Sequence, residues 1–225
     1  GGFGAPAAQS SRTGQSVTLT ATTPSRSGYV FVDWDTDAGG EDVGYSSSQT
    51  LTMPPNNLTL FAQWDFVRYT LSYDANGGTS APSNQTNLTV SQNVTLASSE
   101  PNRSGYVFNG WNTEVDGSGN SYATGSALVM PASDTTLYAE WVANTYTVIY
   151  NANGGGGAPT PEAYSTSDPV AIQTGPTVDK YGHDFEYWST GSDGSGTTYS
   201  PGATPSMPAG GLRLFAQWTL SDVVV

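Results

Sequence analysis

The sequence predicts a mainly β protein made of three tandem small modules that form an elongated rod. All six tryptophans lie on a period of 77 residues, and a fixed period of this size indicates an array of like modules. Short segments rich in aromatic and β-branched residues alternate with Gly- and Asn-rich turns, and no segment has helical periodicity of useful length. The two tryptophan columns are Trp34, Trp111 and Trp188, then Trp64, Trp141 and Trp218.

The period also sets the expected domain boundaries. The links between modules are short and leave little freedom, which favours a stiff rod over a flexible chain. The predicted segments are a first repeat over 1–64 that lacks its first strand, a second over 69–141, a third over 146–218, and a C-terminal tail over 219–225 that aligns with the first strand of a further repeat.

The second repeat is the most complete and defines the elements expected in each module. Tyr69–Tyr73 alternates like a half-buried strand, and Asp74–Gly78 has turn chemistry. In the last predicted strand, Leu137, Ala139 and Trp141 are expected to share one face. The other expected strands are 94–96 and 106–111, with short segments at 87–90 and 127–130 and a glycine-rich connection at 116–120.

The repeated aromatic residues are expected to form the core of each module, because they stand at fixed strand positions beside Leu and Ala. A sugar-stacking platform is the alternative. Phe3 and Phe66 lie off the period and are better candidates for exposed, ligand-binding aromatics. The expected core residues are Phe31, Trp34, Trp64, Phe108, Trp111, Trp141, Phe185, Trp188 and Trp218.

One compound motif runs through the second repeat and returns in part in the others. It comprises Tyr73–Gly78, Arg103, Gly105-Tyr106, Phe108, Gly110-Trp111, Met130–Ala132, Asp134 and Leu137–Trp141. This motif resembles the Listeria–Bacteroides repeat, known from the B-repeat region of internalins and from large bacterial surface proteins. The resemblance implies a small β-grasp-like module that serves as a spacer or adhesion stalk, without catalytic residues or a cofactor.

The outer repeats depart from this motif in places. The third repeat matches through Tyr150–Gly155 and Phe185–Trp188 but carries Lys180 for the arginine and His183 for the aromatic residue. The first repeat lacks the Tyr-Asp-Ala-Asn strand and has Asp33 where the family has glycine.

Composition excludes several classes of partner. Nineteen acidic residues against six basic ones give a net charge of −13, which argues against nucleic acid and anionic membranes. There is no cysteine and hence no disulfide or thiolate site, and no apolar run has the length of a membrane span. The chain opens without Met and without a visible secretory signal, so we expect a processed or trimmed N-terminus.

No catalytic or metal-binding constellation is predicted. His183, the only histidine, takes the repeat position of Tyr29 and Tyr106. We interpret it as a replacement for the aromatic residue of that strand, without a catalytic role. Asp116 and Asp193 each open an Asp-Gly-Ser-Gly run; fragments of calcium loops are one interpretation, but turn chemistry is favoured because the later acids of such loops are missing. Asn-x-Ser/Thr sequons, candidate glycosylation sites, occur at Asn57, Asn84, Asn87, Asn93 and Asn102.

Both ends of the chain fall in the same strand of the module. Val223–Val225 align with Tyr146–Val148, and Gly1-Gly2 align with Gly77-Gly78 after a one-residue gap. The chain is either a window of a longer array or a subunit that donates its tail to the incomplete first repeat of the next copy. The residues expected to take part in such assembly are Thr219, Leu220, Val223, Val224, Val225, Gly1, Gly2 and Phe3.

The predicted function is that of a non-enzymatic, extracellular structural protein, a surface stalk or fibre subunit. Its expected partners are copies of itself, joined head to tail, or neighbouring repeats of a longer surface protein. The alternative is an adhesin module that binds a carbohydrate or a host receptor.

Overall fold

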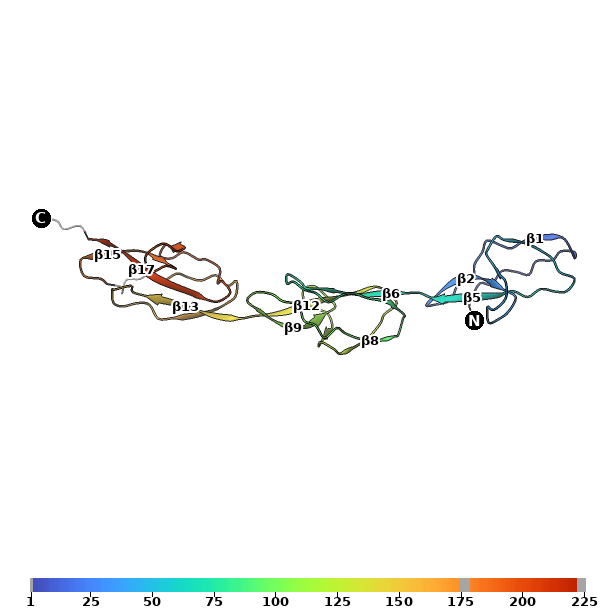
Figure 1. Cartoon of the computed structure of the whole chain (residues 1–225), viewed down its shortest axis with the longest axis horizontal. Helices are drawn as coiled ribbons and strands as arrows, with labels where there is room; N and C mark the ends of the chain where they lie inside the picture. The colour runs from blue at the N-terminus through green and yellow to red at the C-terminus, as the bar shows by residue number, and fades with distance from the viewer. Residues whose placement is uncertain (1, 175–178, 222–225) are drawn as a thin grey trace. The chain divides into compact units, whose positions relative to one another are not determined.

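The computed structural model describes residues 2–174 and 179–221, and within them the chain is all β, with strands β1–β17 and no helix. Figure 1 shows the strands along the chain. The chain divides into two compact units, whose boundary lies inside the second repeat. One unit contains Gly1–Tyr73, Ser83–Leu96 and Gly125–Leu137, and the other contains Asp74–Pro82, Ala97–Thr124 and Tyr138–Val225.

The first repeat has a three-stranded antiparallel sheet in the order β3-β2-β5 and a separate pair, β1-β4. Its central strand alternates exposed and half-buried side chains until it reaches the buried Trp34 and Asp35. The strands are β1 (Ser16–Thr18), β2 (Tyr29–Asp35), β3 (Gly44–Tyr45), β4 (Thr50–Thr52) and β5 (Phe61–Phe66).

The second repeat has a five-stranded sheet in the order β10-β9-β12-β6-β7 and a separate pair, β11-β8. The register of β12 against β9 shifts between Glu140 and Trp141, because β9 has an extra residue, Asn109, between Phe108 and Gly110. The bulge therefore lies in β9, and β12 runs through this point without an inserted residue. The strands are β6 (Tyr69–Asp74), β7 (Gln85–Leu88), β8 (Asn93–Thr95), β9 (Tyr106–Asn112), β10 (Ser121–Tyr122), β11 (Ala127–Val129) and β12 (Thr135–Ala143).

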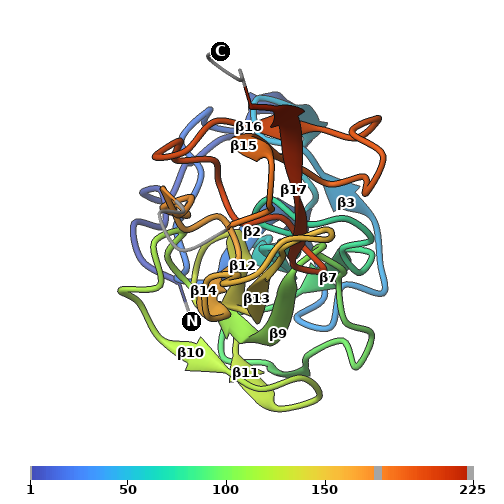
Figure 2. The ribbon, with the colours of Figure 1, turned by 90° about the vertical axis from the view of Figure 1, so that its left-hand side faces the viewer.

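The third repeat repeats this sheet in the order β14-β13-β17-β15-β16. Its first and last strands, β13 and β17, lie parallel at the centre; β14 pairs antiparallel with β13, β15 antiparallel with β17, and β16 antiparallel with β15. This is the strand order expected of a β-grasp-like module. Figure 2 views β13, β15 and β17 from the end of the chain. The strands are β13 (Thr145–Asn151), β14 (Glu162–Ser165), β15 (His183–Ser189), β16 (Thr198–Tyr199) and β17 (Leu212–Leu220).

The core of the third repeat lies against one face of this sheet. Trp188 is fully buried there, and the ring of Tyr150 meets it edge to face with 4.8 Å between the ring centres. The buried members are Val148, Tyr150, Val170, Ile172, Trp188, Met207, Leu212, Leu214 and Ala216. The all-β, three-repeat prediction is confirmed, and the inter-repeat links are even shorter than predicted: residues 67–68 join β5 to β6, and Asn144 alone joins β12 to β13.

Candidate functional site

The first repeat has an open sheet edge where the third repeat holds a strand. In the third repeat, Val148–Asn151 of β13 pair in parallel with Leu212–Phe215 of β17. Two periods earlier, the residues equivalent to these β17 positions are 58–61, yet β5 begins only at Phe61. β5 is six residues long, whereas β12 and β17 have nine each. The residues missing from β5 are those that a first strand would pair with.

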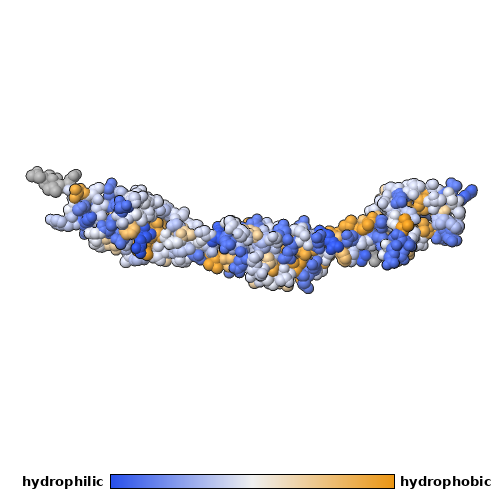
Figure 3. All heavy atoms as spheres, viewed as in Figure 1, coloured by the Kyte–Doolittle hydropathy of each residue, from blue (hydrophilic) through white to orange (hydrophobic). Residues whose placement is uncertain are grey.

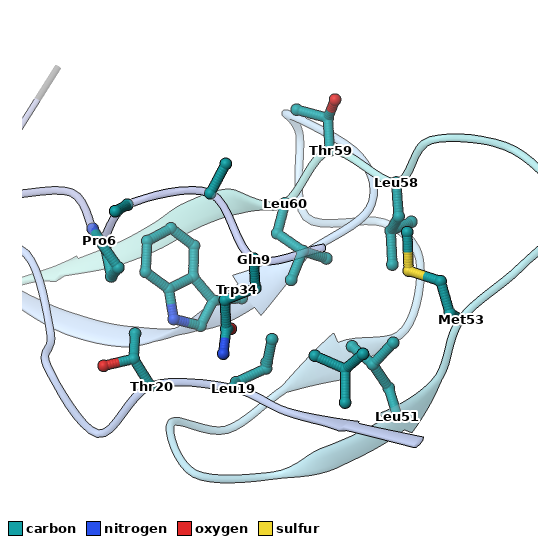
Figure 4. Close-up of a pocket in the computed structure, with 13 residues that line it drawn as sticks. Pro6, Gln9, Leu19, Thr20, Trp34, Leu51, Met53, Leu58, Thr59 and Leu60 are labelled. Carbon is teal, nitrogen blue, oxygen red and sulfur yellow. The ribbon is translucent and has the colours of Figure 1, made fainter. Parts of the chain in front are cut away.

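A groove lies along this edge. It encloses about 360 Å³, and Figure 4 shows Leu19, Leu51, Met53 and Leu60 gathered around the space beside Trp34. Trp34 is 8% exposed, whereas Trp111 and Trp188 are 0% exposed. The segment 6–9 lines the groove from the other side. We call it the strand groove and define it by Val17, Leu19, Trp34, Leu51, Met53, Leu58 and Leu60.

Most residues that line the strand groove stand at positions that are buried in the other repeats. Its leucines and methionine are only half-buried in the first repeat. One period later, the equivalents of Leu19, Leu51, Met53 and Leu60 are Leu96, Leu128, Met130 and Leu137, which are buried with at most 3% of each side chain exposed. The lining is thus nearly the same in both repeats, with Leu58 in place of Thr135, and it is more exposed in the first repeat.

Gly2 marks where the chain enters the first repeat. A Cβ on Gly2 would lie 2.6 Å from Cζ2 of Trp64, and a Cβ on Gly155 would lie 2.5 Å from Cζ2 of Trp218. Both glycines thus pass under a tryptophan ring at equivalent positions, directly after the place of the first strand. Gly1, the other residue of the pair, lies outside the described residues.

Phe3 lies beside a second hollow on the first repeat. Phe3 is 80% exposed, and the hollow of about 630 Å³ is also lined by Arg26 and Trp64. The guanidinium carbon of Arg26 lies 3.7 Å from the centre of the Tyr29 ring. Figure 3 shows hydrophobic residues on the surface over β2 and β5. The exposed hydrophobic side chains of these two strands are Val30, Val32, Phe61 and Phe66.

The C-terminal candidates lie partly in the third repeat itself. Thr219 and Leu220, which the sequence placed in a tail, are the last residues of β17 and pair with Asp184 and His183 of β15. They therefore belong to the sheet of the third repeat. Val223, Val224 and Val225 lie outside the described residues.

The same backbone hydrogen bond recurs at the end of every repeat. The amide of Val67 donates to Gly28 O at 3.0 Å, that of Asn144 to Gly105 O at 2.8 Å, and that of Ser221 to Gly182 O at 3.1 Å. The first two bonds lie where one repeat runs into the next. The third bond lies directly after β17. The amide of Ser221 therefore makes the same hydrogen bond at the end of the third repeat that the amide of Asn144 makes at the end of the second.

A buried threonine strengthens the junction between the second and third repeats. Thr166 Oγ1 lies 2.7 Å from Gly105 O and 3.1 Å from Asn144 O, and the amide of Thr166 donates to Asn144 O at 2.8 Å. The hydroxyls of Tyr106 and Ser167 are 3.2 Å apart. Thr166 of the third repeat therefore provides hydrogen-bond donors to the backbone carbonyls of Gly105 and Asn144 at the junction.

The predicted core residues occupy two environments. The column Trp34, Trp111 and Trp188 is buried, while Trp64, Trp141 and Trp218 are half-buried. The phenylalanines Phe31, Phe108 and Phe185 are half-buried, and each lies between its two tryptophans, with ring centres 5.0–5.9 Å apart. Trp141 and Trp218 also donate from Nε1 to the carbonyls of Ala75 and Ala152 at 3.0 Å.

The titratable candidates have local roles. His183 Nδ1 lies 3.0 Å from Tyr181 O. Hydrogen bonds from the Ser118 hydroxyl and amide lower the pKa of Asp116, and Ser195 lowers the pKa of Asp193 in the same way. Within residues 2–174 and 179–221, no group of three or more His, Asp or Glu side chains is arranged to hold a metal ion.

Family models match almost the whole chain. The Listeria–Bacteroides repeat domain matches residues 69–140 and 146–217, which is more than half of the sequence, and the divergent InlB B-repeat domain matches residues 1–68. The chain belongs to the Listeria–Bacteroides repeat family. The domains detected are non-catalytic repeat domains.

Curated relatives share the repeats over part of their length. The chain is 36% identical over 171 residues to a putative Gly-rich membrane protein of Evansella cellulosilytica, covering 73% of the chain and 19% of the relative. It is 29% identical over 194 residues to internalin H of Listeria monocytogenes, covering 84% of the chain and 32% of the relative. The chain thus spans less than a third of either relative. No solved structure matches it significantly.

Sequence reasoning missed one buried polar position in this Listeria–Bacteroides repeat chain. The residue after the first tryptophan of each repeat, Asp35, Asn112 or Ser189, is at most 3% exposed and binds the hairpin that follows. Asn112 is the most connected: Oδ1 accepts from the amides of Glu114 and Gly119. The position could have been found from the 77-residue period, since these three residues are equivalent in the three repeats. It was missed because the residue type differs in each repeat.

The remaining candidates are accessible surface groups. The five sequon asparagines are all exposed. The described part of the chain contains no helix long and apolar enough to span a membrane.

Proposed function

We propose that the chain is a structural segment of an extracellular bacterial surface protein, acting as a stiff stalk. The observation that carries this proposal is the direct junction between repeats, in which β12 runs into β13 through Asn144 alone. Thr166 and the recurring amide bond to Gly105 hold that junction closed. A chain joined in this way transmits tension through backbone hydrogen bonds. Internalin H and the putative membrane proteins among the relatives support a location at the cell surface or envelope.

Small-angle X-ray scattering of the whole chain tests the stalk. A stiff stalk gives one extended maximum dimension that stays constant as salt increases. The variant Thr166→Val, which loses the junction hydroxyl, is expected to broaden the distance distribution. A compact particle, or a broad distribution in the unchanged chain, would overturn the proposal.

The stalk is further proposed to lengthen by head-to-tail association. Residue 221 already leaves the third repeat by the bond that precedes a following strand, and the first repeat has an open edge. A sheet edge with unpaired backbone groups is a template for a strand from another chain, and a heterologous contact of this kind builds filaments. Deletion of Ser221–Val225 is expected to leave monomers on size-exclusion chromatography. Filaments that survive this deletion would contradict the association.

An adhesin is the second candidate function, favoured by the hollow beside Phe3 with its aromatic and cationic lining. Aromatic side chains with an apolar face and a nearby guanidinium are typical of recognition surfaces. A glycan array probed with the chain and with Phe3→Ala tests this candidate. Binding lost in the variant supports the adhesin, and equal signals from both proteins count against it.

A further inference from the structure

We propose that the second and third repeats each contain a side-chain clamp that resists tension along the chain, formed by the asparagine of the Asn-Gly-Gly turn and the second tryptophan. In the third repeat the clamp consists of Asn153 and Trp218. The inference rests on the proposed stalk and deepens it by naming the residues that bear the load. Its evidence lies within the two repeats that contain this turn.

Tension along the third repeat loads two parallel strands. This repeat runs from β13 to β17, and the two strands pair in parallel over four positions, Val148–Asn151 with Leu212–Phe215. Because parallel strands begin at the same end of a sheet, the start of β13 and the end of β17 lie at opposite ends of the repeat, as Figure 1 shows. A pull along the chain therefore slides one strand past the other and loads the paired positions together.

The asparagine of the clamp ties the turn after β13 to β17. Asn153 lies two residues beyond the last residue of β13, and its Nδ2 donates to Ala216 O, in β17, at 3.0 Å. The same nitrogen donates to Ser192 O, in the hairpin that follows β15, at 2.7 Å. Both hydrogens of the amide are thus used, and the connection between the two strands continues past their last backbone pair.

The tryptophan makes a second bond between the same two segments, in the opposite direction. Trp218 lies in β17, and its Nε1 donates to Ala152 O, next to Asn153, at 3.0 Å. Gly155 passes so close beneath the ring that a Cβ on it would lie 2.5 Å from Cζ2 of Trp218. The turn is therefore held against β17 by side-chain hydrogen bonds and by packing.

The backbone of the turn aims the asparagine amide at β17. Asn153 has φ +49°, a left-handed conformation that asparagine adopts more readily than most residues. Oδ1 of Asn151 accepts a hydrogen bond from the backbone amide of Asn153 at 2.8 Å, which stabilises the turn. Asparagine combines this conformation with two side-chain hydrogens to donate, whereas glycine lacks the side chain and an ionised aspartate lacks the donors.

The second repeat makes the same hydrogen bonds at equivalent positions. Asn76 has φ +46°, and its Nδ2 donates to Ala139 O at 3.0 Å and to Val115 O at 3.1 Å. Trp141 Nε1 donates to Ala75 O at 3.0 Å. The clamp therefore belongs to the repeat itself, since all of its bonds recur one period apart.

Optical tweezers applied to the whole chain in two pulling geometries test the clamp. The chain has no cysteine, so handles are attached to introduced ones at exposed positions. Thr145→Cys with Leu220→Cys places the handles at the start of β13 and the end of β17, and the force shears the strands. Thr145→Cys with Arg213→Cys places both handles near the starts of these parallel strands, and the force peels them apart from that end.

The two geometries are expected to give different unfolding rates. At equal force, the third repeat should unfold about a hundredfold more slowly under shear, because several hydrogen bonds break together instead of one at a time. Equal rates in the two geometries would overturn the inference.

Asn153→Gly separates the side-chain clamp from the backbone pairing. Glycine tolerates the positive φ and removes the amide, so the variant is expected to unfold about tenfold faster under shear. Its peeling rate should change by less than about twofold, because peeling begins at the other end of the strands. Trp218→Phe, which keeps an aromatic ring and loses the Nε1 donor, is expected to unfold about three- to tenfold faster under shear.

Thr190→Val is the matched control. It removes a hydroxyl that accepts from the amide of Thr197 at 2.8 Å, a bond within the β15–β16 hairpin and outside the two loaded strands. The control is expected to change the shear rate by less than about twofold. If Asn153→Gly unfolds under shear no faster than the control, the side-chain clamp is refuted.

The clamp and the stalk fail in different experiments. Equal unfolding rates in the two pulling geometries would refute the clamp and leave the extended particle seen by scattering unaffected. A compact particle in scattering would refute the stalk, while slower unfolding under shear that depends on Asn153 would still support the clamp.

Discussion

The hydroxyl oxygen of Thr166, in the third repeat, lies 2.7 Å from the carbonyl oxygen of Gly105, in the second. Gly105 has φ +81°, and a Cβ on it would lie 2.6 Å from Cγ2 of Thr166. The two residues thus close the junction by a hydrogen bond and by direct packing. Glycine is required at position 105 because of its positive φ and because a Cβ would overlap Thr166.

Replacement of Gly105 tests this packing. Gly105→Ala is expected to lower the free energy of unfolding by about 2–4 kcal/mol, since it combines backbone strain with overpacking against Thr166. Gly182→Ala is the matched control, because Gly182 has φ +69° and open space around its Cβ position. In the control, the free energy of unfolding should fall only by the backbone strain of an alanine at positive φ, about 1–2 kcal/mol. Denaturant titrations of both variants measure the difference, and equal costs would contradict the packing role.

Removal of the Thr166 hydroxyl tests the hydrogen bond separately. Thr166→Val keeps the shape of the side chain and leaves the carbonyl of Gly105 without its side-chain donor. Because Thr166 is buried, the expected cost is about 1–3 kcal/mol. Ser167→Ala, which removes an exposed hydroxyl beside Tyr106, is the control and is expected to change stability by less than about 0.5 kcal/mol. Hydrogen exchange of the Asn144 amide should speed up in the first variant only.

The fold was largely predictable from periodicity, because each strand repeats an alternating pattern at a fixed spacing. The ends of the strands were harder to predict from the sequence. For example, β12 continues to Ala143 because β9 provides pairing partners as far as Tyr106. The bulge at Asn109 in β9 was not predictable, since it depends on pairing with β12, which is distant in sequence. The missing first strand was visible in the alignment, whereas the groove depends on where the segment 6–9 lies and could not be derived without coordinates.

Asn112 allows a test of the buried polar anchor. Its Nδ2 lies 3.0 Å from Glu140 Oε1, so Asn112→Asp would bring a second carboxylate against the first. Burial and the like charge raise the pKa of the new aspartate in the folded protein. The penalty, about 3 kcal/mol, is therefore present at neutral pH and shrinks as the pH falls and the aspartate is protonated. Asn112→Ala, which adds no charge, should show no such recovery when melting temperatures are compared between pH 7 and pH 4.

The Asp-Gly-Ser-Gly turns predict a pH effect at a single residue. Ser118→Ala removes the hydroxyl donor to Asp116 and should raise its pKa toward the ordinary value of a free aspartate. The stabilisation from the lowered pKa is present above the unfolded-state pKa and is lost as the pH falls through the folded one. Asp193 keeps Ser195 and serves as an internal control in the same sample. Carboxyl NMR titration measures both, and an unchanged Asp116 would contradict the assignment.

The glycine under the second tryptophan column gives the sharpest structural test. A Cβ on Gly155 would meet Cζ2 of Trp218 at 2.5 Å and the backbone oxygen of Asp179 at 2.6 Å, and the backbone has little room to move away. Trp218 is itself held by its Nε1 bond to Ala152 O at 3.0 Å. Gly155→Ala is therefore expected to cost about 1–3 kcal/mol and to shift the tryptophan fluorescence.

The neighbouring glycine isolates this effect, because a Cβ on Gly156 would have no atom within 4 Å. Gly156→Ala should change the unfolding free energy by about 0.5 kcal/mol or less. The same contrast applies to the first repeat, where Gly2→Ala would meet Trp64 as Gly155→Ala meets Trp218. If Gly2→Ala proves neutral while Gly155→Ala is costly, the entry of the chain into the first repeat is looser than in the third.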